Sequence, residues 1–327
     1  MNANRRHALR LALAAAVLSF GAGVHAQTTE ISFGIISTES TQNLREDWQP
    51  LLDDFARQTG FKVKAFFAPD YAGIIEAMRF NKVQVAWFGN KSAMEAVDRA
   101  GGEVFAQMVN ADGSQGYYSH LIVHRDSPLK SLDDVLKNAK SLSFGNGDPN
   151  STSGFLVPSY YVFALNKVDP KTAFKVVRTA NHETNALAVA NRQVDVATNN
   201  NENLDKLKQR FPDKYDSIRI VWTSPLIPSD PLVMRADLPA ATKARIRDFF
   251  YNYGRNEHER NVLHKLSKLA GFKESSNRQL IPIRQLELFR EKTKLEADAA
   301  MPAADRQARI AEIDRRLAEL NHQLAQR

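Results

Sequence analysis

Short apolar runs alternate with stretches of helical periodicity along residues 31–100, and the same order returns after Pro128. When helices separate successive strands in this way, the strands favour a mainly parallel sheet with helices packed on its faces. The sequence therefore predicts an α/β protein. The expected strands cover residues 31–36, 62–67, 83–88, 141–145, 174–179 and 194–198. The expected helices cover residues 43–58, 71–80, 91–100, 131–139, 152–166 and 183–192.

The length of the chain predicts two lobes, because 327 residues exceed the ~100–200 residues of one ordinary domain. Residues 231–235 (PLVMR) read as a strand. The helical stretches near 239–253 and 256–269 have no alternating strands of their own, so we expect them to pack back on the first lobe. The expected division is a signal peptide at 1–26, a discontinuous lobe 1 at 27–125 and 231–290, lobe 2 at 126–230, and a C-terminal helical tail at 291–327.

The first 26 residues read as a secretory signal peptide. They begin with Arg5, Arg6 and Arg10, continue with an apolar run over residues 11–20, and end at Ala26, after which we expect cleavage. A bilayer-spanning helix needs ~20 apolar residues, so this run is too short to serve as one. Sec export is favoured over twin-arginine export, because the phenylalanine usual after an arginine pair is absent. The mature protein is expected in the periplasm, and no later stretch reads as a transmembrane helix.

The charge balance argues against nucleic acid as a partner. The chain has 44 Lys and Arg against 37 Asp and Glu; loss of the three signal arginines leaves 41 against 37, a net charge of +4. This excess is mild, and the chain has no Lys/Arg blocks interleaved with aromatic residues. The chain contains no cysteine, so export brings no disulfide framework and stability must come from burial.

The end of the chain has a pattern of its own. Ile310, Ile313, Leu317, Leu320 and Leu324 are spaced by three and four residues within a stretch rich in Arg, Glu and Ala. This spacing predicts an amphipathic helix with a narrow apolar seam. Two heptads are too few to predict a coiled coil. Two possibilities therefore stay open: a helix docked on its own chain, and a contact that forms a homodimer.

Residues 147–158 (GDPNSTSGFLVP) place three hydroxyl side chains, Ser151, Thr152 and Ser153, at the start of an expected helix. The first N–H groups of a helix are unpaired, and the helix dipole favours negative charge there. Hydroxyls and amides together make a socket for an oxyanion such as a phosphate or phosphonate group. Plain helix capping is the alternative, although it needs one hydroxyl rather than three. A nucleotide P-loop is disfavoured, because the glycines before the cluster are not followed by Gly-Lys-Ser/Thr.

Three more polar residues fall at places where an α/β fold binds ligands. His182 begins an expected helix, where a histidine can donate a hydrogen bond to an anion or serve as a surface cap. Glu202 follows the strand VDVAT, and Asp230 lies in the loop SPLIPSDP; both are in loops of the kind that carry ligands in an open sheet. Acidic loop residues are usually only solvated. If these two meet across a cleft, they would suit an ammonium group.

Several long stretches occur in an order that identifies a family. They are FGIISTES, AFFAPDYAGIIEAMRFNKVQVAWFGN, SAMEAVDRAGGEVFAQ, FGNGDPNSTSGFLVP, HETNALAVAN, VDVATNN and SPLIPSDP. Together, over about residues 31–290, they resemble the phosphonate-binding protein of bacterial phosphonate-uptake ABC transporters. The resemblance implies a type II-like periplasmic binding protein in which two lobes, each a sheet flanked by helices, are joined by two hinge crossovers. It also implies a C-terminal helix, a permease in the inner membrane as partner, no cofactor and no enzymatic activity.

The resemblance further implies which residues hold the ligand. Those implied for the phosphonate group are Ser151, Thr152, Ser153, Tyr71, Tyr117 and His182. Those implied for the amine of an aminoalkylphosphonate such as 2-aminoethylphosphonate are Glu202 and Asp230.

Other functions stay open. A receptor for phosphate, phosphite or a phosphate ester would use the same oxygen-binding groups. A Ser-dependent hydrolase could use Ser151, His182 and Asp230, although this serine is not in a Gly-x-Ser-x-Gly elbow. No metal site is expected, because HERNVLH (258–264) lacks a second histidine four residues after His258.

Overall fold

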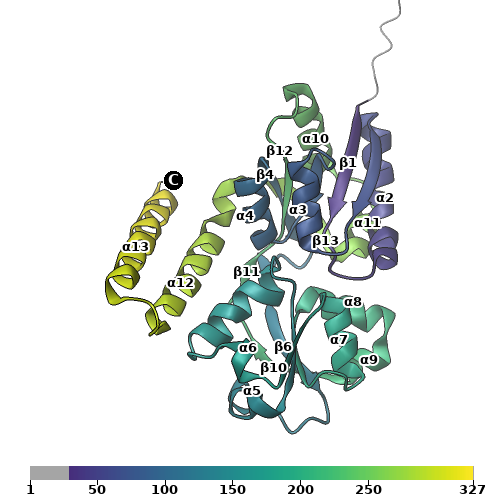
Figure 1. The fold of residues 1–327 in the computed structure, drawn as a ribbon. Coiled ribbons are helices and arrows are strands. Elements are labelled where there is room, and N and C mark those ends of the chain that lie inside the picture. Colours follow the sequence, from purple (N-terminus) through teal and green to yellow (C-terminus); the bar gives the residue numbers. More distant parts are fainter. Residues whose placement is uncertain (1–28, 327) are drawn as a thin grey trace, which may run out of the picture.

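The computed structural model describes residues 29–326, and within them the chain folds into two α/β lobes joined by a hinge (Figure 1). Two C-terminal helices lie at the side of these lobes. The predicted signal peptide, residues 1–26, lies outside the described residues. Among residues 29–326, no helix combines the length and the apolar character that crossing a membrane requires.

The sheet of the first lobe is mixed rather than mainly parallel. Strand β1 pairs in parallel with β2 and β3, but β12 and β13 run antiparallel to their neighbours. Its strand order is β13-β4-β12-β3-β1-β2. The bounds are β1 (Glu30–Ile35), β2 (Lys62–Phe67), β3 (Val85–Trp87), β4 (Gly102–Asn110), β12 (Pro231–Arg235) and β13 (Leu269–Glu274). Strand β13 corrects the expectation that the late helices have no strand of their own; its sequence, LAGFKE, is short and carries a glycine and two charges.

Helices cover both faces of this sheet, and the pleat divides the core between them. Neighbouring residues of one strand point to opposite faces: Val85 joins the core under α2, α10 and α11, whereas Ala86 joins the core under α3 and α4. Strand residues buried on both sides explain the nearly continuous apolar runs in the sequence. The helix bounds are α2 (Thr41–Thr59), α3 (Tyr71–Arg79), α4 (Asn90–Arg99), α10 (Ala240–Asn252) and α11 (Glu257–Ser267).

Local sequence signals set the ends of α2. The Ser40 side chain accepts a hydrogen bond from the Asn43 N–H at 3.2 Å, and Gly60 ends the helix with a φ of 70°. A positive φ of this kind suits glycine, which has no Cβ to clash. Leu44, Trp48 and other apolar residues at helical spacing then pack α2 onto β1 and β2.

The second lobe is built on a five-stranded sheet of order β10-β6-β9-β7-β8. Strands β9, β7 and β8 pair in parallel, while β6 pairs antiparallel with β9, and β10 pairs antiparallel with β6. The strand bounds are β6 (Ser119–His124), β7 (Ser143–Asn146), β8 (Val176–Thr179), β9 (Val196–Asn200) and β10 (Ile218–Thr223). The helix bounds are α5 (Leu132–Asn138), α6 (Pro170–Ala173), α7 (His182–Ala190), α8 (Asn201–Arg210) and α9 (Pro212–Asp216).

A small antiparallel pair, β5 (Gly116–Tyr117) and β11 (Ile227–Pro228), connects the lobes. A Cβ on Gly116 would lie 1.8 Å from the Ile227 carbonyl oxygen, so this crossing requires glycine. The chain enters the second sheet before Ser119, whereas the sequence analysis drew that boundary after residue 125. The reason is that β6 pairs with β9 and β10 directly after the hinge.

The helix expected at 152–166 is instead two π-helical segments, Thr152–Leu156 and Ser159–Ala164. Pro158 lies between them and has no N–H to continue a regular helix. Single π-helical turns within helices occur frequently at functional sites.

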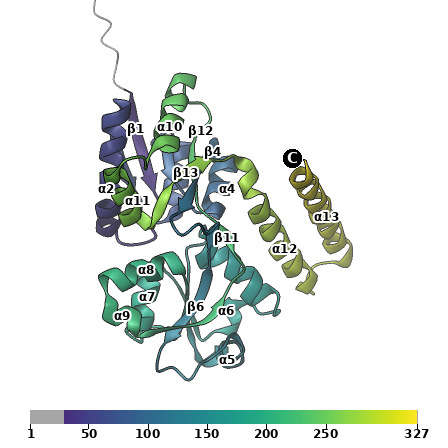
Figure 2. The same ribbon diagram turned by 180° about the vertical axis from the view of Figure 1, so that it is seen from behind.

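The apolar seam of the tail packs on the chain itself. Helices α12 (Ile281–Ala297) and α13 (Ala303–Ala325) form a hairpin that projects beside the two lobes in both views (Figure 2). Ile313 and Leu317 are buried against Leu288 and Leu295 of α12. Docking in cis is therefore present, and Leu324 at the end of the seam remains 39% exposed.

Candidate functional site

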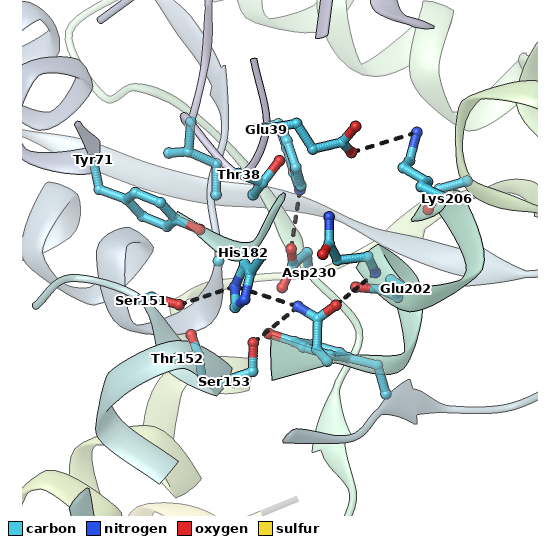
Figure 3. A pocket seen from close by; sticks show the side chains of 17 residues that line it. Thr38, Glu39, Tyr71, Ser151, Thr152, Ser153, His182, Glu202, Lys206 and Asp230 are labelled. Atoms are coloured by element: carbon cyan, nitrogen blue, oxygen red, sulfur yellow. Dashed lines mark hydrogen bonds and ion pairs between the residues drawn. The ribbon is translucent and has the colours of Figure 1, made fainter. Parts of the chain in front are cut away.

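A cavity of about 50 Å³ lies between the two lobes (Figure 3). All eight residues that the sequence analysis selected line it, although they come from both lobes and the hinge. The lining residues are Ile36, Thr38, Glu39, Tyr71, Trp87, Gly89, Tyr117, Ser151, Thr152, Ser153, His182, Asn200, Glu202, Asn203, Lys206, Asp230 and Ser267. A cavity of this size holds a few water-sized groups, so the structure offers a site for a small ligand.

The N-termini of several helices meet at this cavity. Tyr71 is the first residue of α3, His182 is the first of α7, and Gly89, Ser151 and Asn200 are the N-caps of α4, the π-helical segment and α8. Each of these ends carries unpaired N–H groups and a partial positive charge. Their convergence makes the cavity favourable for an anion.

The hydroxyl cluster has more roles than capping alone. Ser151 Oγ accepts from the Gly154 N–H at 3.0 Å, as an N-cap does, and lies 3.4 Å from His182 Nε2. Thr152 Oγ1 accepts from the Lys91 N–H at 2.8 Å. Ser153 Oγ accepts from Asn200 Nδ2 at 3.0 Å. All three hydroxyl oxygens accept hydrogen bonds from the protein, and each hydroxyl also has one O–H proton that it can donate to an oxyanion in the cavity.

His182 lies beside this cluster as a neutral ring. Burial lowers the pKa of His182 to about 4, so the imidazole carries no charge at pH 7. Its Nε2 lies 3.4 Å from Asn200 Nδ2, and its Nδ1 is buried without a hydrogen-bond partner among residues 29–326. The ring can therefore offer one N–H donor, but it does not supply positive charge.

Tyr71 and Tyr117 line the cavity from α3 and from the hinge strand β5. Both side chains are buried. Burial raises the pKa of both phenols, so each keeps its O–H proton and can act as a donor. A set of neutral donors such as these hydroxyls and phenols binds an oxyanion without needing a cation.

Glu202 and Asp230 lie together at the other end. Asp230 Oδ2 accepts from Trp87 Nε1 at 3.1 Å, while Asp230 Oδ1 is buried without a hydrogen-bond partner in the described chain. Glu202 is partly accessible and also lines a neighbouring hollow of about 360 Å³. Burial, and for Glu202 also the charge of Asp230, raises the pKa of both carboxyls. A cation placed between them would oppose this shift, because it favours the charged form of each carboxyl.

The hydrolase arrangement left open by the sequence is not formed. Asp230 accepts from Trp87 rather than from His182, and the free nitrogen of His182 has no carboxylate beside it among residues 29–326. A triad needs the acid to orient the histidine. Within the same residues, no group of three His, Asp or Glu side chains is placed to hold a metal ion.

Sequence reasoning missed several lining residues, notably Trp87, Asn200 and Lys206. Trp87 read only as part of a strand, and Asn200 stood in a run of asparagines. Lys206 carried a usable signal, because it follows Glu202 by four residues and must share its side of α8.

Lys206 and Arg210 of α8 form ion pairs with the first lobe. Arg210 Nη2 lies 2.7 Å from Asp47 Oδ2, and Lys206 Nζ lies 3.9 Å from Glu39 Oε1; Arg210 also pairs with Glu39, and Lys206 with Asp47. Glu39 and Asp47 are buried. Burial raises the pKa of Glu39, although the two cations oppose this shift. The lobes are thus held in contact by charge as well as by the hinge.

Comparison with known proteins adds independent findings. A family model described as the periplasmic substrate-binding protein of the phosphonate ABC transporter matches residues 33–280. The phosphonates-binding periplasmic protein of Escherichia coli is 57% identical over 299 residues, which cover 91% of this chain and 88% of that protein. A phosphate-import protein of Mycolicibacterium smegmatis is 30% identical over 207 residues, 60% of this chain and 63% of that one. The crystal structure of a binding-protein component of an ABC phosphonate transporter from Pseudomonas aeruginosa superposes with a TM-score of 0.90 at 55% identity, covering 91% of this chain and 98% of that chain.

Proposed function

This chain belongs to the family of periplasmic phosphonate-binding proteins of ABC transporters, and from that premise we propose that it captures 2-aminoethylphosphonate and other alkylphosphonates between its lobes. It then delivers them to a permease in the inner membrane. We also propose export by the signal peptide at residues 1–26, with cleavage after Ala26. The Escherichia coli and Pseudomonas aeruginosa relatives described above are binding proteins, the second a component of an ABC transporter, which agrees with reversible capture rather than turnover.

The phosphonate group occupies the end of the cavity that carries neutral donors. Ser151, Thr152 and Ser153 donate from the second lobe, together with His182, and Tyr71 and Tyr117 donate from the first lobe and the hinge. Because both sides of the cleft contribute, an anion bound here favours the closed arrangement over an open one.

The amine occupies the acidic end, between Glu202 and Asp230. The observation that carries this proposal is Asp230 Oδ1, a buried acceptor without a hydrogen-bond partner among residues 29–326, in the same cavity as the hydroxyl cluster. A buried acceptor left unpaired costs about 1–3 kcal/mol, more when it is charged. An ammonium group bound here would form the missing hydrogen bond and also neutralise the carboxylates.

Titration calorimetry of residues 27–327, freed of carried ligand, tests this proposal with 2-aminoethylphosphonate, methylphosphonate and phosphate. We expect one-to-one binding, tightest for 2-aminoethylphosphonate, weaker for methylphosphonate and weakest for phosphate. The absence of heat with all three ligands would reject the phosphonate site. Equal affinities for 2-aminoethylphosphonate and methylphosphonate would reject the role of the acids.

A receptor for phosphate, phosphite or a phosphate ester is the second candidate. Its support is the phosphate-import relative, which is 30% identical, and the fact that the donor end would accept the same oxygens. Phosphate would place its fourth oxygen toward Glu202 and Asp230, where like charges repel it. Tighter binding of phosphate than of either phosphonate in the same titration would favour this candidate.

Two further features belong to the proposal. A homodimer through the C-terminal helix remains a candidate, since part of the α13 seam is exposed beyond its contact with α12.

The role as a binding protein also predicts no turnover: incubation with excess 2-aminoethylphosphonate should release no phosphate or amine. Conversion of more than one ligand per protein molecule would contradict it.

A further inference from the structure

A second small cavity of about 30 Å³ lies directly behind the acidic pair. It shares six lining residues with the ligand cavity, so the two spaces adjoin across Glu202 and Asp230. The shared residues are Glu39, Trp87, Glu202, Lys206, Asp230 and Ser267. We call this space the rear chamber. Nothing in the capture of a primary amine requires it.

The wall of the rear chamber away from the ligand is apolar. Leu44 and Trp48 come from α2, Met108 from β4 and Leu266 from α11, and all four are buried. The Trp48 and Trp87 rings pack against each other with their centroids 5.2 Å apart, and both contribute aromatic surface to the lining. Such walls accept alkyl groups, and aromatic faces also attract a cation and the methyl groups attached to it.

Some of the polar groups at its edge are already paired. Glu39 and Lys206 form ion pairs with each other and with Arg210 and Asp47, and Asp230 Oδ2 accepts from Trp87. A buried water needs two to four polar partners, and few remain at this edge once the amine of the ligand occupies Glu202 and Asp230. The chamber is therefore better suited to an alkyl group than to water.

We propose that the rear chamber receives one methyl-sized substituent on the ligand amine, so that N-methylated aminoalkylphosphonates are also substrates. This inference rests on the proposed function, because it requires the amine to lie between Glu202 and Asp230. A secondary ammonium keeps two N–H donors, one for each carboxylate, and directs its methyl group past them. A trimethylated nitrogen has no N–H donor and exceeds the space.

Titration calorimetry with N-methyl-2-aminoethylphosphonate tests the inference, with 2-aminoethylphosphonate and its N,N,N-trimethyl form for comparison. We expect the N-methyl ligand to bind within about fivefold of the primary amine, since burial of one methyl group offsets the loss of one N–H. The trimethyl ligand should bind at least about 100-fold more weakly. If the primary amine binds tightly but the N-methyl ligand is more than about 30-fold weaker, the chamber is refuted and the proposed function stands. If neither amine binds, the proposed function itself fails.

Substitutions that fill the chamber give a second test. Leu44→Phe should weaken the N-methyl ligand at least tenfold and the primary amine by less than about threefold. Leu266→Phe, which fills the chamber from another helix, should do the same. Unchanged binding of methylphosphonate shows that each variant is folded. Leu51→Met, on α2 but outside the chamber and of similar volume, is the matched control and should change none of the three affinities. Equal losses for both amines, or no loss for either, would overturn the assignment.

Discussion

The two ends of the ligand cavity are built in opposite ways. The donor end has neutral hydroxyls, a neutral histidine and helix N-termini, and its three hydroxyl residues, Ser151, Thr152 and Ser153, are consecutive in the chain. The acidic end has two carboxyls from α8 and from the segment before β12, with the pKa of each raised by burial. The first end is preorganised for any tetrahedral oxyanion. At the acidic end, burial of the two carboxylates is unfavourable in the absence of a cation. We therefore propose that the donor end provides most of the affinity and that the acidic end provides the selectivity for an amine.

Of the changes considered, Asp230→Asn should have the largest effect on affinity, and it should affect only the ligand that carries an amine. The change keeps the shape and removes the charge, and loss of one partner of a buried charged pair costs ~2–5 kcal/mol. We expect 2-aminoethylphosphonate to bind ~30-fold to several-thousand-fold more weakly, with methylphosphonate unchanged or tighter, as measured by calorimetry. Asp237→Asn, an exposed acid paired with Arg235, is the control. Equal weakening of both ligands would show that Asp230 supports the fold rather than the amine.

Thr152→Val should weaken both ligands together. It removes one hydroxyl at constant shape, and a hydrogen bond to a charged group is worth ~1.5–3 kcal/mol, which is ~10- to 100-fold in affinity. Because the Thr152 oxygen also accepts from the Lys91 N–H across the cleft, closure suffers equally with either ligand. Ser141→Ala, on an exposed turn, should have no effect. A loss confined to the aminophosphonate would contradict the assignment of the two ends.

Asp47→Asn should also lower affinity uniformly, although Asp47 does not line the ligand cavity. Its ion pairs with Lys206 and Arg210 join the lobes, so the change lowers the fraction of closed protein and raises every apparent Kd. Contacting charges couple by about 0.5–3 kcal/mol; we expect a loss of about 1–2 kcal/mol, which raises the apparent Kd ~5- to 30-fold. Small-angle scattering of the ligand-free protein should show a larger radius of gyration. An unchanged radius with unchanged affinity would mean that the ion pairs do not contribute to closure.

A change of pH should alter ligand binding at the acidic end of the cavity but not at the donor end. Burial raises the pKa of Glu202 and Asp230, so these carboxyls take up a proton above their usual range of about 4. As the pH rises through the raised values, the free protein loses the stability that the protonated forms contributed. A ligand with an ammonium group should restore this stability, because its charge compensates the two carboxylates. We expect the affinity of 2-aminoethylphosphonate relative to methylphosphonate to rise about twofold to tenfold between pH 5.5 and 8.5. Each affinity is first corrected for titration of that ligand's own phosphonate group, since the ammonium group lowers the phosphonate pKa of 2-aminoethylphosphonate relative to that of methylphosphonate. If the ratio of the two affinities did not change with pH, amine binding would not depend on the charge of Glu202 and Asp230.

The sequence predicts the features that depend on neighbouring residues and misses those that depend on contacts between distant parts of the chain. The expected strand positions and the cluster at 151–153 could be located because they depend on neighbours in the chain, through periodicity and capping. Trp87 could not be assigned to the site, because its contact is with Asp230, 143 residues along the chain. Lys206 could be located by its spacing from Glu202, but its ion pairs arise only when α8 lies against the first lobe. Strand β6 was placed in the wrong lobe because pairing partners far along the chain, in β9 and β10, decide its sheet. The mixed pairing of both sheets has the same cause.

Deletion of residues 301–327 should have the smallest effect on binding, less than about twofold for either ligand. Helix α13 packs on α12 beside the lobes and contributes no residue to the cavity (Figure 1). Its removal exposes Leu288 and Leu295, each of which is worth ~1.5–3 kcal/mol when fully buried, so the melting temperature should fall. Sedimentation of the two forms decides the role of the tail: a full-length dimer that becomes a monomer assigns it to assembly, and a monomer that only loses stability assigns it to docking in cis. A changed ratio between the two ligands would mean that selectivity reaches beyond the acidic end, and the comparison would fail.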